Sequence, residues 1–237
     1  MSGANIGGTS GTLAVGWGSG TTQFPYLITP LEALQWRARQ DGSVFQWVLD
    51  DFDYSSIASI AAQATVCFAF VKSDSGEGYI SVDGNIGDRN NLTAWEQGDQ
   101  LITTVAGSCA NTIVVVHSVG QINMEAWADH PNVSAILWAS LPGQESGDSL
   151  VDVIYGDVNP SGRLPFTIAR NDSDYSSSVL FVPNDGNSSA PYDDFSEGLL
   201  VDYRAFDAKN IDPRYEFGFG LSYTTFNVCP SVYCAEI

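Results

Sequence analysis

Short apolar runs alternate with amphipathic stretches through the middle of this chain. The apolar runs are rich in β-branched and aromatic residues, and they occupy residues 44–49, 65–71, 112–118 and 133–139. Runs of this length and composition are typical of strands that are buried on both faces, as in a parallel sheet. We therefore predict that these four runs form parallel strands of one sheet.

Stretches of helical character separate or follow the predicted strands. They cover residues 55–64, 92–107, 123–130 and 144–156. Strands that alternate with helices are typical of an α/β domain, in which right-handed crossovers place helices on both faces of a mostly parallel sheet. Ligands of such domains bind at the carboxyl ends of the strands, so we expect any site at that edge.

The alternation stops after Pro160. Residues 161–169 could supply another strand, whereas residues 170–197 are dominated by Asp, Ser, Asn, Gly and Pro and are predicted to form a long surface loop. We therefore expect one α/β domain over residues 1–227. We expect residues 1–43 to be partly irregular and residues 228–237 to form a short atypical tail.

Composition narrows the classes of partner. The chain has 237 residues, of which 44% are hydrophobic, so it can bury a substantial core. Its formal net charge of -19 disfavours nucleic acid and anionic membranes as partners, and a neutral ligand such as a sugar suits it better. The acidity also fits a simple, well-solvated surface. No apolar segment reaches the roughly 18 to 20 residues that span a bilayer.

The N-terminal residues and the glycosylation sequons point in different directions on secretion. The first residues, "MSGANIGGTSGT", have neither the basic region nor the apolar run of a secretory signal. Asn-X-Ser/Thr sequons, which matter only in the secretory pathway, begin at Asn91, Asn132, Asn171 and Asn187.

The four cysteines are not spaced as zinc ligands. Cys67 lies in an apolar run and is interpreted first as a buried thiol. Cys229 and Cys234 are close enough in sequence to form a disulfide, and the pairing of Cys109 stays open.

Glu77 is the first candidate for chemistry. It lies between Gly76 and Gly78, in the loop that directly follows the predicted strand 65–71, where this fold class places its sites. A purely structural turn would have a similar composition. The surrounding carboxylates and aromatic rings suit a carbohydrate, because sugars stack on rings while their hydroxyls bond to polar side chains.

Other common chemistries have little support. His117 and His130 are 13 residues apart on different predicted elements, so they do not form a paired metal site, and His117 fits a buried or supporting histidine. The stretch "GWGSG" (16–20) has the pattern of neither a nucleophile elbow nor a phosphate-binding loop. We therefore expect no metal and no cofactor.

Four blocks of sequence resemble a known family. They are "SDSGEGYISVDGNIGDRNNL", "TIVVVHSVG", "LPGQESGDSLVDVIYGDVNPSGRLPFT" and "YEFGFGLSYTTF". In this order, from about Gly11 to Asn227, they resemble the second domain of fungal β-glucosidases of glycoside hydrolase family 3. The resemblance implies a six-stranded α/β sandwich beside an N-terminal barrel, with the active site between the two domains.

The resemblance also implies roles for individual residues. Glu77 in "SGEGY" matches the general acid/base, Tyr79 matches an aromatic residue at the site of the leaving sugar, and Ser19 matches a contact to the glucose at the cleavage point. Ser19 also fits a turn serine among glycines. Asp74 and Asp83, if they are close to Glu77 in space, would favour its protonated form.

Some parts of the family pattern are not matched. The resemblance places the nucleophile on an aspartate of the barrel, which needs about 200 residues or more, and no stretch here provides them. A first strand before "GTLAVGWGSG" is also expected to be missing.

Two functions follow from the resemblance. The chain is expected either to supply the acid/base of a secreted, retaining β-glucosidase that acts on cello-oligosaccharides and other β-glucosides, or to be a non-catalytic carbohydrate-binding or interaction module. In the first case the barrel is its partner, and the chain alone should be inactive.

Overall fold

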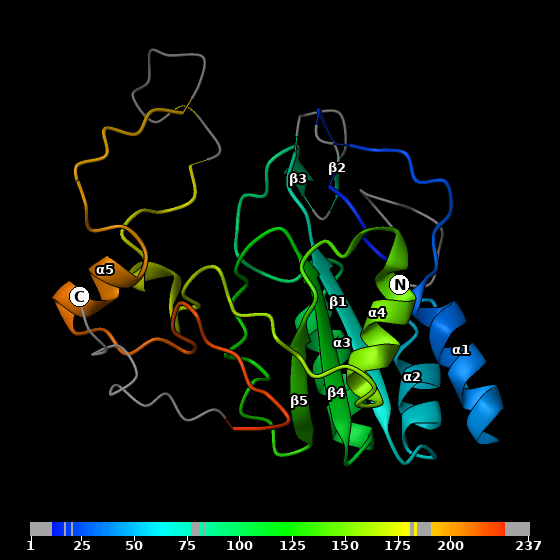
Figure 1. Ribbon diagram of the computed structural model, residues 1–237. Helices are drawn as coiled ribbons and strands as arrows, with labels where there is room; N and C mark the ends of the chain where they lie inside the picture. The colour runs from blue at the N-terminus through cyan, green and yellow to red at the C-terminus, as the bar shows by residue number, and fades with distance from the viewer. Residues whose placement is uncertain are drawn as a thin grey trace, which may run out of the picture.

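The computed structural model describes residues 11–16, 18–19, 21–76, 81–82, 84–180, 183 and 191–225. A sheet of three parallel strands lies at its centre (Figure 1). The strands are β1 (Cys67–Ser73), β4 (Thr112–Ser118) and β5 (Val133–Trp138), in the order β1-β4-β5. Three of the four predicted strands are thus confirmed, and so is the mostly parallel α/β class.

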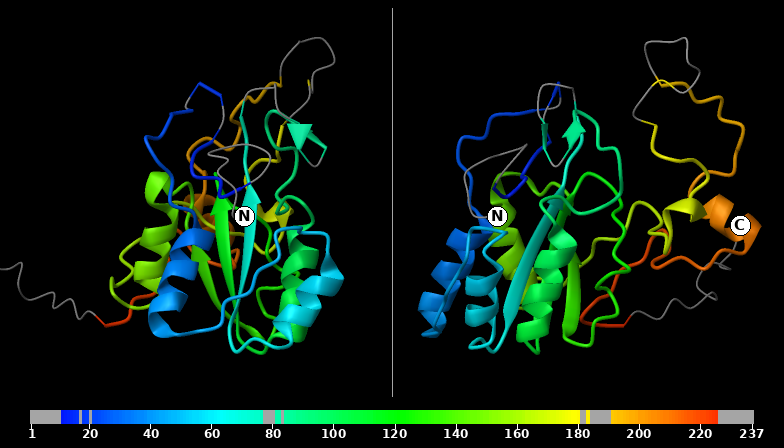
Figure 2. Two further views of the ribbon diagram at one scale, coloured as in Figure 1. Left: turned by 90° about the vertical axis from the view of Figure 1, so that its right-hand side faces the viewer. Right: turned by 180° about the vertical axis from the view of Figure 1, so that it is seen from behind.

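Helices cover both faces of the sheet (Figure 2). One face packs against α2 and α3, and the other against α1 and α4. The bounds of the helices are α1 (Pro30–Asp41), α2 (Tyr54–Ala61), α3 (Gly98–Ser108), α4 (Ser146–Ile154) and α5 (Tyr203–Lys209), with short 3-10 turns η1 (Gly143–Glu145) and η2 (Asp172–Asp174).

The side chains of β1 explain this three-layer packing. Cys67, Ala69 and Val71 join the core beneath α2 and α3, whereas Phe68 and Phe70 pack on the opposite side with residues of α1 and α4. Because successive side chains of a strand point to opposite faces, a continuous apolar run buries both faces. The same reason makes such runs recognisable in the sequence.

Helix α1 was not among the predicted helices. Thr29 and Glu32 form a capping box at its start, Pro30 occupies the first turn, and Gly42 ends it with a φ of 68°. The amide of Gly147 in α4 donates to the carbonyl of Ile28 at 2.8 Å. These contacts seat α1 against α4.

The run 44–49 is not a strand, which corrects one prediction. Val44 is 91% exposed and Leu49 is 55% exposed, and no ladder joins this segment to another strand of the described chain. The physical reason is its neighbourhood: a cavity separates residues 43–51 from β1, so the run lacks a hydrogen-bonding partner.

Two predicted helices also differ from the structure. Residues 125–129 form turns rather than a helix, since an eight-residue stretch is too short to be helical without support. Helix α3 begins at Gly98 rather than at residue 92, because Glu96 and Gln97 both have a φ of 55°, which lies outside the helical region. Residues 161–169 contribute only an isolated bridge between Ile168 and Tyr215.

Cys67 is not a free thiol. It forms a disulfide with Cys109, which joins the start of β1 to the end of α3 across a Cα–Cα distance of 6.3 Å. Cys229, Cys234 and the tail 228–237 lie outside the described residues. No helix in the described part of the chain is both long and apolar enough to cross a membrane.

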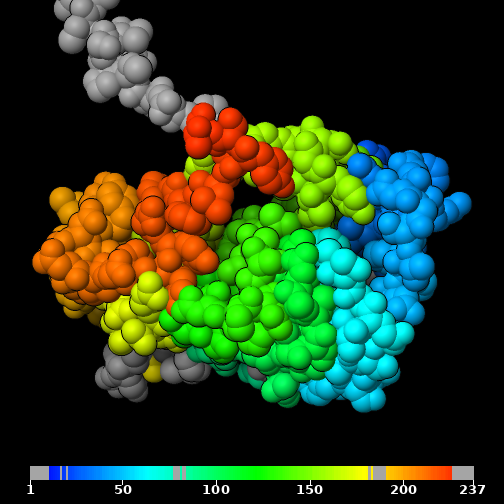
Figure 3. All heavy atoms as spheres, turned by 90° about the horizontal axis from the view of Figure 1, so that it is seen from below, coloured from blue at the N-terminus to red at the C-terminus, as the bar shows by residue number. Residues whose placement is uncertain are grey.

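The described residues after 190 lie on the β5 side of the sheet. In the space-filling view, these orange and red segments pack beside the green ones, away from the blue and cyan helices α1 and α2 (Figure 3). Arg214 fixes them there, because its guanidinium donates to Glu125 at 2.5 and 2.7 Å and to Asp129 at 2.7 and 2.8 Å. The β1 side is therefore not covered by these residues.

Candidate active site

The candidate site is the edge at which the strands of the sheet end. The chain leaves β1 at Ser73, whose carbonyl accepts a hydrogen bond from Val119 N at 3.2 Å, just beyond β4. Residues 11–16 also reach this edge, because the carbonyl of Ala14 accepts from Gly143 N at 2.9 Å. Segments far apart in sequence therefore meet where the fold class places ligands.

Thr12 and Gly16 fix residues 11–16 at this edge. The carbonyl of Thr12 lies 3.1 Å from His117 Nδ1, and its hydroxyl lies 2.7 Å from the hydroxyl of Ser146. Gly16 lies so close to β1 that an added Cβ would be 3.4 Å from Asp74 Oδ1. Residues 11–16 thus lie beside the end of β1.

Ser19 is exposed in the turn that follows. Thr21 closes this turn, because its amide donates to Gly18 O at 3.0 Å and its hydroxyl donates to Gly16 O at 3.1 Å. The structure therefore brings Ser19 to the predicted edge of the sheet and leaves its side chain open to solvent. Its role toward a sugar stays a prediction.

The loop after β1 is tied together at its base. Asp74 is fully buried and accepts from Ser75 N at 2.8 Å. The hydroxyl of Ser75 donates to Asp88 Oδ1 at 2.9 Å and accepts from Arg89 N at 3.1 Å. Both limbs of the loop are therefore held together by one serine.

Glu77, Tyr79 and Asp83 belong to this loop but lie outside the described residues. The described part nearest to them is a small antiparallel ribbon of β2 (Ser81–Val82) and β3 (Asn85–Ile86). Gly84 connects the two with a φ of 81°, and the buried side chain of Asn85 accepts from Asn90 N at 2.6 Å. The returning limb is thus also held by a hydrogen bond to a buried side chain.

Arg89 is a residue of this edge that the sequence analysis did not identify. Its guanidinium donates to the carbonyl of Gln121 at 2.8 Å and lies 3.5 Å from the hydroxyl of Ser73. Burial lowers the pKa of Arg89, and the charges of Tyr175 and Asp74 oppose that shift. Gly120 leaves room for this side chain, since an added Cβ would lie 3.0 Å from Arg89 Nη2. A positive charge therefore sits beneath the loop.

His117 lies behind the edge as a buried, neutral side chain. It is fully buried, and its ring meets that of Phe70 edge-on at a centroid distance of 6.4 Å. Burial lowers the pKa of His117 to about 4, so the ring is uncharged at neutral pH and donates from Nδ1 to Thr12 O. This is the supporting position that the sequence predicts.

The sequons differ in accessibility. Asn91 and Asn171 are exposed, and the hydroxyl of Thr93 donates to Asn91 Oδ1 at 2.7 Å. Asn132 is half-buried and its side-chain amide donates to Ala106 O at 2.8 Å. Asn187 lies outside the described residues, and glycosylation at all four positions stays a prediction.

Comparison with known proteins identifies relatives with this fold. The family described as "Glycosyl hydrolase family 3 C-terminal domain" matches residues 2–223. Beta-glucosidase 1 of Aspergillus aculeatus is 57% identical over 219 residues, which cover 92% of this chain and 25% of that protein. A probable β-glucosidase of Arthroderma benhamiae is 54% identical over 220 residues, with 92% and 27% covered.

Solved structures agree with these sequence relatives. A family 3 β-glucosidase from Neurospora crassa superposes with a TM-score of 0.85 at 52% identity, over 90% of this chain and 25% of that chain. β-glucosidase 3B from Thermotoga neapolitana, solved with glucose, gives a TM-score of 0.69 at 28% identity, over 92% and 34%. The chain thus spans about a quarter of the length of the curated relatives that it matches. It belongs to glycosyl hydrolase family 3, in which it corresponds to the C-terminal domain.

Proposed function

We propose that this chain supplies the general acid/base of a retaining β-glucosidase, which hydrolyses terminal β-D-glucosyl residues of cello-oligosaccharides and other β-glucosides. Glu77 is the acid/base, and the nucleophile is an aspartate of a barrel domain outside these residues. One observation carries the proposal: the loop that contains Glu77 leaves β1 at the carboxyl edge, and Ser75, Asp88 and Arg89 tie its base together. The β-glucosidase names of the relatives support the reaction class.

Each carboxyl group has its own task in such a mechanism. Glu77 protonates the glycosidic oxygen while the nucleophile attacks the sugar, and it then removes a proton from the water that releases the glucose. The two carboxyl groups must be about 5 Å apart, so the loop has to be presented to the barrel in a fixed position. The bonds at its base supply that rigidity.

Ser19 and Tyr79 are the proposed contacts to the sugar. Ser19 is exposed on a turn beside the end of β1, which suits a hydrogen bond to a hydroxyl of the glucose at the cleavage point. Tyr79 offers a ring on which the leaving sugar can stack. A neutral sugar is also compatible with the net charge of -19.

The test requires an enzyme in which the nucleophile is present. This segment would replace its counterpart in a complete family 3 β-glucosidase, and Glu77→Gln would be made in the active chimera. We expect cleavage of substrates with poor leaving groups to slow by about 100- to 10,000-fold, the range for loss of a general acid/base. Dinitrophenyl glucosides need little protonation and should lose much less in the first step.

Azide separates the catalytic role from a structural one. A small anion can attack the glycosyl-enzyme without base assistance, so azide should restore turnover of the activated substrates and give the β-glycosyl azide. Asp207→Asn, which removes an exposed charge in α5, serves as the matched control and should keep full activity. Equal loss for all leaving groups without an azide effect would favour a non-catalytic module instead.

A further inference from the structure

Two exposed tryptophans line one cleft on the α1 flank of the molecule. Trp36 in α1 is 59% exposed, and Trp47 in the segment that follows α1 is 50% exposed. The cleft, which we call the tryptophan cleft, has a volume of about 460 Å³ and is within the size range of small-molecule sites. Large aromatic side chains that face solvent in one concave space indicate a site for a ligand or partner.

One wall of the tryptophan cleft is a single face of α1. Glu32, Gln35, Trp36 and Arg39 follow the spacing i, i+3, i+4 and i+7, which places them in one stripe along a helix. The guanidinium of Arg39 lies over the ring of Trp36, 5.7 Å from its centroid, so it covers one face of the indole. This face of α1 thus combines an aromatic ring with three polar groups.

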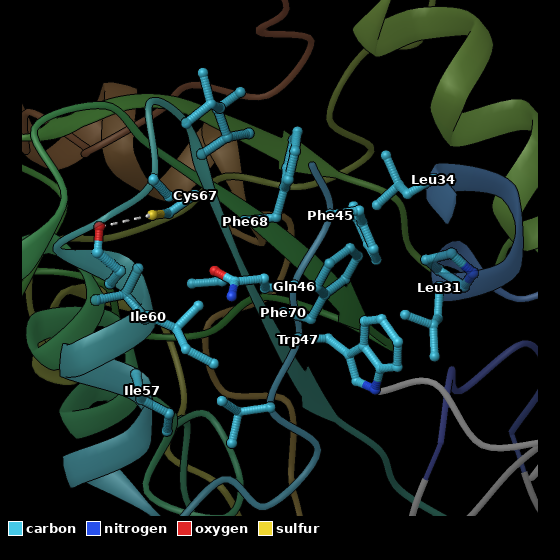
Figure 4. A pocket seen from close by; sticks show the side chains of 18 of the residues that line it. Leu31, Leu34, Phe45, Gln46, Trp47, Ile57, Ile60, Cys67, Phe68 and Phe70 are labelled. Carbon is cyan, nitrogen blue, oxygen red and sulfur yellow. Dashed lines mark hydrogen bonds between the residues drawn. The ribbon is translucent and has the colours of Figure 1, made fainter. Parts of the chain in front are cut away.

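The other wall comes from alternate side chains of residues 43–51. Phe45 and Trp47 point from this segment toward α1, whereas Gln46 between them points the opposite way (Figure 4). The ring centroids of Phe45 and Trp47 are 6.0 Å apart, and their planes are inclined by only 30°. The exposed indole of Trp47 therefore extends an aromatic surface that begins at the half-buried Phe45.

The polar groups of the α1 wall are open to a ligand. Glu32 uses one oxygen, Oε2, to accept from Thr29 N at 2.9 Å and from the Thr29 hydroxyl at 2.7 Å. These bonds lower the pKa of Glu32 and hold its carboxylate in place, while Oε1 accepts no hydrogen bond from a described residue. Within the described chain, the side chains of Gln35 and Arg39 also form no hydrogen bond or ion pair. Donors and acceptors therefore border the aromatic rings.

This combination of rings and polar groups selects the class of ligand. An anion would meet Glu32 and a net charge of -19, and a cation would meet Arg39 on the ring that it has to approach. A wholly apolar ligand would bury the carboxylate and the guanidinium without hydrogen bonds. A neutral sugar stacks the C–H face of its ring on an indole and bonds through its hydroxyls to the polar groups. Glucose in β-linkage fits best, because its equatorial hydroxyls leave both faces of the ring flat and apolar.

The tryptophan cleft is separate from the candidate active site. Helix α1 runs from the carboxyl edge of the sheet toward the opposite edge, so its last turn, with Arg39, lies away from the loop after β1 (Figure 1). None of the described residues that line the cleft belongs to 11–19 or 73–91. A sugar in this cleft would therefore be bound without being cleaved.

We propose that the tryptophan cleft is a second carbohydrate site, which binds a β-glucan chain on Trp36 and Trp47 and holds it against the domain without cleaving it. Such a contact raises the concentration of glucan near the enzyme. The inference goes beyond the proposed function, because it assigns these two residues a ligand of their own and does not depend on Glu77.

The test uses the full 237-residue chain with cellotetraose as the probe. The indole N–H signals of Trp36 and Trp47, assigned by single substitution in proton–nitrogen correlation spectra, should shift as cellotetraose is added. Those of the buried Trp95 and Trp127 should not shift. A linear β-galactan tetrasaccharide is the control sugar. The axial hydroxyl on each of its rings breaks the flat face, so it should bind about tenfold more weakly or less.

Substitutions locate the site. Trp36→Ala and Trp47→Ala should each weaken binding of cellotetraose about tenfold, because each removes one stacking surface. Both side chains are exposed, so these variants are expected to fold. Trp36→Phe keeps a ring at its position and should retain most of the affinity. Phe195→Ala, which removes a 68% exposed ring outside the cleft, is the matched control and should leave binding unchanged.

Three outcomes would overturn the proposal. They are the absence of shifts at Trp36 and Trp47, equal binding of the galactan, and full affinity in both alanine variants. Shifts of the same signals with chain concentration alone, together with a dimer in sedimentation, would assign the cleft to a second copy of the chain instead.

Ser19→Ala separates the tryptophan cleft from the candidate active site. This variant should leave the shifts of Trp36 and Trp47 unchanged, and their loss would contradict a separate site. None of these readouts uses hydrolysis, so a failure here leaves the proposed role of Glu77 untouched.

Discussion

Single buried residues at the carboxyl edge of the sheet support the loop after β1 and residues 11–16. Arg89 and Asp74 bring opposite charges beneath the loop, and His117 supports residues 11–16 through its bond to Thr12. These contacts join residues as far apart as Thr12 and His117. The stability of this edge of the sheet therefore depends on these buried side chains.

The buried His117 predicts a loss of stability in acid. Its pKa of about 4 in the folded chain lies below the ordinary value of 6.5, so the unfolded chain binds the proton more tightly. The contribution of His117 is fully present above pH 6.5 and is lost as the pH falls toward 4. We expect the free energy of unfolding to fall by up to about 3 kcal/mol over this range from this residue.

His117→Asn checks this origin of the pH dependence. Asparagine keeps a donor that can reach Thr12 O but does not titrate. The slope of unfolding free energy against pH, measured by denaturant titration between pH 4 and 6.5, should become flatter in this variant. An unchanged slope would place the acid sensitivity in other groups.

Gly147 allows the helices α1 and α4 to pack closely against each other. A Cβ at this position in α4 would overlap the carbonyl of Thr29 and lie 2.9 Å from Ala33 Cβ in α1. Gly147→Ala should therefore force α1 and α4 apart and cost about 1–3 kcal/mol of stability.

Gly107→Ala in α3 is the matched control. An added Cβ meets nothing within 4 Å there, so alanine should stabilise the helix by about 0.5–1 kcal/mol. Opposite signs for the same substitution, measured by chemical denaturation, are the expected result. A gain in both variants would contradict the close contact between α1 and α4.

The disulfide links β1 to the end of α3, the helix that packs on one face of the sheet. Cys67 at the start of β1 and Cys109 after α3 close a loop with a sequence separation of 42 residues. Loop-closure entropy for this length predicts that joint replacement of both cysteines by alanine lowers the free energy of unfolding by about 4 kcal/mol. A reductant should lower the free energy of unfolding of the natural chain by a similar amount and leave that of the double variant unchanged.

Strands were predicted from the sequence where the pattern is local, and missed where it depends on partners. Residues 67–73 and 112–118 carry enough apolar side chains to bury both faces, and residues 133–138 are mostly apolar although Ser134 and Ala135 are exposed, so composition alone identifies all three. Residues 44–49 show a similar pattern, yet they lack an adjacent strand. Helix α1 could have been found from its signature of Thr29, Pro30 and Glu32.

The candidate site was predictable only in part for a similar reason. The position of the loop follows from the end of a buried strand, which the sequence shows. The bonds that hold it do not, because Ser75 and Asp88 are 13 residues apart and Arg89 reaches Gln121 across 32 residues. Such contacts depend on the folded sheet rather than on any local motif.

In the proposed mechanism, the whole chain supplies the general acid/base but not the nucleophile. Incubated alone with an aryl β-glucoside, the purified 237-residue chain should show no turnover above background, because protonation of the leaving group without a nucleophile leaves most of the barrier in place. Release of the aryl alcohol measures this directly. Hydrolysis by a homogeneous sample would mean that the nucleophile lies within these residues.

The link between Cys67 and Cys109 also sets how the chain responds to mechanical force. Tension applied at the two ends would pass from one sulfur to the other and bypass the residues between them, which include β1 and α3. The sequence separation of 42 residues corresponds to about 140 Å of extended backbone. This segment does not extend under load while the disulfide is intact. The fully unfolded chain therefore reaches a shorter end-to-end length when it is oxidised than when it is reduced.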